Sequence, residues 1–113
     1  MIEAVLIDYL TNKTAAGASV YAEVPNDQPD TYIVIEKTGS VTENRITTST
    51  MAIRSIAPSL LAAAALNEQV KAAMDVSPEL DAITASRLNS DYNFTDATSK
   101  QYRYQAVFQV THY

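Results

Sequence analysis

The chain of 113 residues has no cysteine, only two glycines and a single histidine. Without cysteine there is no disulfide, no thiolate metal ligand and no cysteine nucleophile. Gly17 and Gly39 are too far apart to form a glycine-rich loop that binds phosphate, so the common nucleotide-dependent reactions are not expected. His112 lies in phase with the aromatic face of the last predicted strand, where packing is a more common role than catalysis. We therefore expect no enzyme and no catalytic or cofactor-binding residue.

Metal ligands are not expected either. The carboxylates of Asp27 and Asp30, and those of Asp91 and Asp96, are loosely spaced in predicted loops or turns. They lack the glycine turn and the terminal glutamate of a calcium-binding loop. We interpret them as solvated turn residues.

Basic side chains are few and scattered, with 8 Lys and Arg against 13 Asp and Glu and a formal net charge of -5. Nucleic-acid binding draws much of its affinity from Lys and Arg contacts with phosphate, so we expect no sequence-specific nucleic-acid binding. The longest apolar run, residues 60–66, is much shorter than the roughly 20 residues that cross a membrane. No basic segment precedes the first apolar pattern, which argues against a signal peptide. These features favour a cytoplasmic protein.

The clearest strand pattern lies in residues 31–57. Residues 32–35 are apolar on both alternating faces, which is typical of a central strand. Gly39 and Ser40 permit a turn, and a run rich in Thr, Ser and Ile follows over residues 43–57, so we predict a hairpin. Residues 41–50 are mostly polar and could not be buried without hydrogen-bond partners, so we expect this part of the hairpin to project.

Two amphipathic helices are predicted, over residues 2–12 and residues 60–74. Ser59 is placed to cap the second helix. The residues expected to face the core at helical spacing are Ile2, Val5, Leu6, Tyr9 and Leu10 in the first helix, and Ala63, Leu66, Val70, Ala73 and Met74 in the second. The second helix is expected to leave Asn67, Glu68, Gln69 and Lys71 outside.

The remaining segments complete one sheet. We predict a weak edge strand at residues 19–24, a proline-containing loop at 24–30, a strand at 80–88, a turn at 89–93 and a final strand at 102–110. The final strand alternates clearly and should pack one face under a helix. The chain is thus predicted to be a single α+β domain, residues 1–113. It has a mainly antiparallel β-sheet, two α-helices packed on one face and a long projecting β-hairpin.

This layout resembles the small tail-completion, or tail-terminator, proteins of long-tailed bacteriophages and prophages, relatives of the lambda tail terminator in the minor capsid or head-tail joining family. The matching segments are residues 25–36, 59–74 and 102–110, and the similarity in layout covers nearly the whole chain. The resemblance implies a structural virion protein, assembled in the host cytoplasm. Such a protein is expected to form a hexameric ring on the head-proximal end of the tail tube, to end tail polymerisation and to join tail to head. The implied partners are the tail tube protein and the head connector protein, and DNA passes through the ring.

The candidate interface residues come from the predicted hairpin and from two tyrosines beside a turn or a terminus, because tyrosine is enriched at interfaces. The oligomer or tube interface is expected to include Thr42, Glu43, Asn44, Arg45, Thr47, Thr48, Tyr92 and Tyr113. Two alternatives remain open. The first alternative is a head-side connector or adaptor. The second is a small ligand-binding or regulatory domain, which would need a concave pocket with convergent polar groups.

Overall fold

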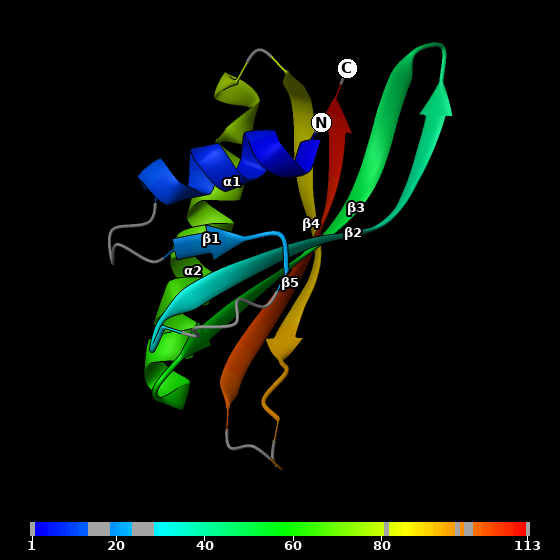
Figure 1. Cartoon of the computed structure of the whole chain (residues 1–113). Coiled ribbons are helices and arrows are strands. Elements are labelled where there is room, and N and C mark those ends of the chain that lie inside the picture. The colour runs from blue at the N-terminus through cyan, green and yellow to red at the C-terminus, as the bar shows by residue number, and fades with distance from the viewer. Residues whose placement is uncertain are drawn as a thin grey trace.

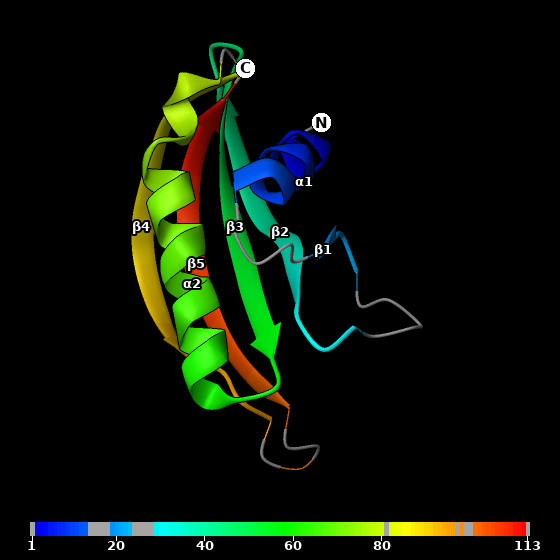
Figure 2. The same cartoon turned by 90° about the vertical axis from the view of Figure 1, so that its left-hand side faces the viewer.

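The computed structural model describes residues 2–13, 19–23, 29–80, 82–96, 98 and 101–112. The elements, in chain order, are α1 (Ile2–Lys13), β1 (Ser19–Tyr21), β2 (Tyr32–Glu43), β3 (Ile46–Ala57), α2 (Leu60–Asp75), the 3-10 turn η1 (Ser77–Glu79), β4 (Ile83–Asn93) and β5 (Tyr102–His112). The strands form one sheet in the order β1-β2-β3-β5-β4, in which only β1 and β2 are parallel. Both helices lie on the same face of the sheet (Figures 1 and 2). The predicted α+β fold is confirmed.

The main core lies between the two helices and this face of the sheet. Both predicted helical stripes are buried or packed against it, and β5 contributes Ala106, Phe108 and Val110 as its alternation predicts. The buried hydroxyl of Tyr9 in α1 donates to the carbonyl of Ala73 in α2 at 2.8 Å, which ties the helices together. Burial, and secondly the negative charge of Glu79, raises the pKa of Tyr9. No helix in the described part of the chain is both long and apolar enough to cross a membrane.

Helix α2 begins as predicted, because the Ser59 side chain accepts a hydrogen bond from the backbone N–H of Ala62 at 3.1 Å. One residue of this helix differs from the prediction. Asn67 was expected outside, but it is only 1% exposed. Helix α2 packs against the edge strand β4, and Asn67 points into that contact, where its Nδ2 donates to Oδ2 of Asp91 at 3.1 Å.

The β2–β3 hairpin turns later than predicted. The expected turn at Gly39 and Ser40 is wrong, because the strands pair as far as Glu43 and Ile46 and the turn consists of Asn44 and Arg45. Both turn residues have positive φ, 52° and 67°, as the commonest two-residue hairpin loop requires. Gly39 instead adjoins a register shift within β2, so it belongs to a bulge.

The outer part of β3 is not free of the sheet. Strand β3 pairs with β2 from Ile46 to Ile56 on one side and with β5 from Thr47 to Ala57 on the other. The expectation that residues 41–50 project is therefore not met for β3, and only residues 43–46 lie beyond the β3–β5 pairing. The buried residues 32–35 of β2 lie second from the edge of the sheet, with β3 at its centre.

The edge strands also differ from the prediction. The turn predicted at residues 89–93 is wrong, because β4 continues to Asn93. An edge strand pairs on one side only, so it accommodates polar, turn-favouring residues whose side chains face solvent. The pairing of β4 with β5 also shifts register twice, and such bulges are common at the edges of sheets. The edge position of β1 is confirmed, whereas residues 24–28 of the predicted loop and Tyr113 lie outside the described residues.

Candidate functional site

One contact in the structure combines a possible nucleophile with a possible base. Ser49 Oγ on β3 lies 2.8 Å from Nε2 of His112 on β5. Ser49 is fully buried, with no exposed surface. A serine acts as a nucleophile only if the substrate can reach it, so the geometry supports a structural role for this pair. Among the described residues, no group of three or more His, Asp or Glu side chains could hold a metal ion.

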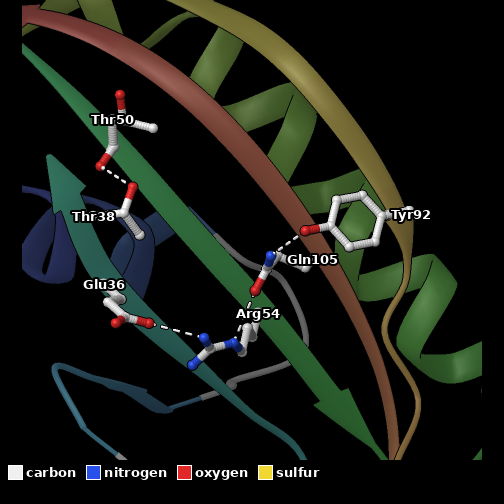
Figure 3. A network of polar contacts seen from close by, with 6 residues as sticks. All are labelled: Glu36, Thr38, Thr50, Arg54, Tyr92 and Gln105. Carbon is white, nitrogen blue, oxygen red and sulfur yellow. Dashed lines mark hydrogen bonds and ion pairs between the residues drawn. The ribbon is translucent and has the colours of Figure 1, made fainter.

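The sheet face opposite the helices, called the open face below, carries a polar network (Figure 3). Arg54 at its centre contacts Oε2 of Glu36 through Nη2 and Oε1 of Gln105 through Nε, both at 2.8 Å. Gln105 Nε2 in turn donates to the hydroxyl of Tyr92. Arg54 pairs with Gln105 and Gln105 with Tyr92 in the strand register, so the four side chains come from β2, β3, β5 and β4 in succession.

An aromatic residue lies beside this network. The guanidinium carbons of Arg54 and Arg103 lie 5.5 and 5.0 Å from the ring centroid of Phe94, within the range of cation–π attraction. The Tyr92 ring meets the same ring edge-on at 6.0 Å. The open face therefore has an end rich in arginine and aromatic side chains, which sequence reasoning found only in the case of Tyr92.

The predicted interface residues do not form one site. Thr42, Glu43, Asn44, Arg45, Thr47 and Thr48 gather at the hairpin tip. Tyr92 lies level with Arg54, which is seven positions from Thr47 along β3, or about 23 Å in an extended strand. Only the tip residues remain together.

The hairpin tip, residues 41–48, has an apolar component that sequence reasoning did not single out. Val41 is 70% exposed and Ile46 is 43% exposed. In the antiparallel register, Val41 pairs with Thr48 and Ile46 with Glu43, so Val41 and Ile46 are diagonal neighbours on one face of the hairpin. On the other face, the hydroxyls of Thr42 and Thr47 lie 2.9 Å apart. The signal available in the sequence was two aliphatic residues inside a Thr-rich run.

A cleft of about 340 Å³ lies between α2 and β4 on the helix side of the sheet, called the α2–β4 cleft below. Its lining combines an apolar wall with a charged rim and consists of Glu68, Lys71, Ala72, Asp75, Ser86, Leu88 and Phe108. Lys71 Nζ contacts Oε1 of Glu68 at 2.8 Å and Oδ2 of Asp91 at 3.0 Å. The Ser86 hydroxyl is buried and has no hydrogen-bond partner among the described residues.

Lys71 is expected to make stability sensitive to alkaline pH. Hydrogen bonds with Glu68 and Asp91 raise the pKa of Lys71 above its ordinary value of 10.5. A raised pKa in the folded state means that the contribution is complete below pH 10.5 and is lost as the pH rises through the folded-state pKa. Urea unfolding is measured below pH 10.5 and above the folded-state pKa of Lys71. The free energy of unfolding should fall more between these conditions for the natural chain than for Lys71→Met.

The control for removing a lysine is Lys37→Met, because the nearest carboxylate oxygen to Lys37, in Glu3, is 4.0 Å away. Parallel stability profiles for the natural chain and Lys71→Met would contradict the prediction.

The fold thus offers three surfaces for binding, namely the open face, the hairpin tip and the α2–β4 cleft. A comparison with known proteins finds no protein family that the chain matches and no curated protein to which it is significantly similar.

Proposed function

We propose that the protein is a structural assembly protein of the phage tail-terminator kind. It binds copies of itself and other proteins and has no reaction of its own. The observation that carries this proposal is the pair of open sheet edges. Strand β1 covers the outer side of β2 only at residues 32–34, and none of the described residues pairs with the rest of that side or with the outer side of β4. The N–H and C=O groups along such edges are available to a second chain.

The two edges favour a ring. They belong to different strands at opposite sides of the sheet, so a contact between the β2 side of one copy and the β4 side of the next is head-to-tail. A head-to-tail contact closes into a ring when its rotation divides a full turn. Six copies is the number suggested by the resemblance in layout to tail terminators.

In this proposal the ring sits on the head-proximal end of the tail tube, ends its polymerisation and binds the head connector. The tail tube protein and the connector are therefore the proposed partners, and the assembled virion tail is the proposed location. A ring of such subunits has a central opening through which DNA passes. The burial of the Ser49 hydroxyl beside His112 is consistent with a role without catalysis.

Electron microscopy of lysates from the parent phage or prophage with this gene deleted tests the function. We expect overlong tails beside DNA-filled heads that lack tails, because nothing would then stop the tube from growing. Supplying the natural gene in trans is the control and should restore normal virions. Tails of normal length left unattached would move the protein to the head side of the junction, and ordinary virions would contradict the proposal.

A further inference from the structure

The hairpin tip is a surface that the rest of the described chain leaves largely exposed. Val41 and Ile46 are exposed as diagonal neighbours on it. Covering these two side chains would remove apolar surface from water, which is favourable. Asn44 and Arg45 form a tight two-residue turn, so little conformational entropy would be lost on docking. Arg45 has no carboxylate partner among the described ion pairs. The tip thus carries two exposed aliphatic side chains, with Glu43 and Thr48 on the same face, and an arginine at its end.

The α2–β4 cleft has the complementary character. Leu88 is half-exposed on one wall, and Phe108 forms a buried floor. The Asp75 carboxylate on the rim makes no ion pair among the described residues, whereas Lys71 is held by Glu68 and Asp91. Ser86, whose buried hydroxyl has no hydrogen-bond partner among the described residues, lines the same cleft. A segment that fills this cleft would need aliphatic side chains, a cation and a hydrogen-bonding group.

The strand order separates the two surfaces. The tip belongs to β2 and β3, whereas the cleft is bounded by β4 at the opposite edge of the sheet. Figure 2 shows α2 over the β4 side, away from β2. A copy therefore cannot place its tip in its own cleft. A contact between tip and cleft joins two copies head-to-tail, which is the contact type that a ring needs.

We infer that the α2–β4 cleft binds the hairpin tip of a second copy of this chain. Ile46 and Val41 pack against Leu88, and Arg45 pairs with Asp75. Backbone groups of the turn supply the hydrogen bond to the Ser86 hydroxyl. This contact rests on the proposed ring and names the surfaces that build it.

Site-directed crosslinking tests this contact, because the chain has no cysteine and only introduced thiols can react. The variants Ile46→Cys and Ser86→Cys are mixed at high concentration and oxidised. A disulfide forms only when the two Cα atoms come within about 7 Å, so we expect a 46–86 crosslinked dimer. A chain carrying both substitutions should give a ladder of crosslinked oligomers that ends at the closed ring.

The matched control is Leu61→Cys, which places a thiol on the 84% exposed position at the start of α2, outside the cleft lining. We expect the 46–86 product to exceed the 46–61 product by about tenfold, because docking raises the effective concentration of the first pair only. Equal yields of the two products, or a 46–46 product as the main species, would overturn the contact.

A charge exchange tests the proposed ion pair separately. Arg45→Asp and Asp75→Arg, each added to the cysteine variants, should reduce the 46–86 product, and the two together should restore it. No restoration would refute the pairing of Arg45 with Asp75. The crosslink and the gene-deletion phenotype are independent readouts. A 46–86 crosslink together with ordinary virions from the gene deletion would support the contact and refute the tail function. Overlong tails from the deletion without a 46–86 crosslink would refute the contact alone.

Discussion

Ile53→Asp is expected to leave no cooperatively folded protein. Ile53 is fully buried on β3, the central strand of the sheet, on the face that both helices cover. A carboxylate there would have no partner in an apolar core, which costs several kcal/mol against a total stability of roughly 5–15 kcal/mol. Circular dichroism with a thermal scan should show no cooperative transition, and size exclusion should show an expanded or aggregated chain.

Val34→Asp is the matched comparison, because it places the same charge on a buried position of the neighbouring strand. Val34 lies on the open face and pairs directly with Arg54, whose guanidinium could bind the new carboxylate. We expect this variant to be destabilised but folded. If Ile53→Asp kept a cooperative transition at the melting temperature of the natural chain, the core would not lie where the structure places it.

Shortening the hairpin is expected to abolish self-assembly and binding to the tail tube while the domain stays folded. The variant lacks Thr42, Glu43, Ile46 and Thr47 and joins Val41 to Thr48 through Asn-Gly, a sequence suited to a two-residue turn. Two residues are removed from each strand, so every remaining side chain keeps its face. Apart from the β2–β3 ladder itself, the change removes only the pairing of Thr47 with His112.

Two measurements separate fold from assembly in this variant. The melting temperature should fall by only a few degrees, whereas crosslinked oligomers and sedimentation with tail tubes should be lost. The control Asn44→Gly keeps the full length and a turn residue that tolerates positive φ, so it should behave like the natural chain. Unfolding of the shortened chain would show that the tip is needed for stability, and undiminished assembly would show that the tip is not an interface.

Periodicity predicted the elements whose exposure changes regularly along the chain. The stripe in α1, the Ser59 cap and the alternation of β5 gave helices and strands close to the observed ones. The same spacing could also have placed Asn67 correctly, because it lies four residues after Ala63 and three before Val70, both buried. Its polar side chain was taken to mean exposure, and its contact with Asp91 depends on a strand 24 residues away.

Local turn chemistry misled where the sheet decides the register. Gly39 and Ser40 are a stronger turn signal than Asn44 and Arg45, but the pairing of β3 with β5 extends as far as Thr47 and moves the turn outward. Pairing with β5 likewise keeps residues 90–93 extended in strand β4, although their sequence favours a turn. The open-face network requires four strands in register, so no local pattern could have revealed it.

The place of β5 between β3 and β4 has a consequence for the order of folding during synthesis. Among the described residues, strand β4 pairs with β5 alone, and one edge of β3 stays unpaired until β5 is present. Until residues 102–112 have left the ribosome, the nascent chain can close the β2–β3 hairpin and its helices but cannot complete the sheet. Such late, long-range pairing slows folding and leaves the unpaired edge of β3 open to other nascent chains. The emergence of residues 102–112, and not that of the hairpin, therefore commits this part of the chain to its native structure.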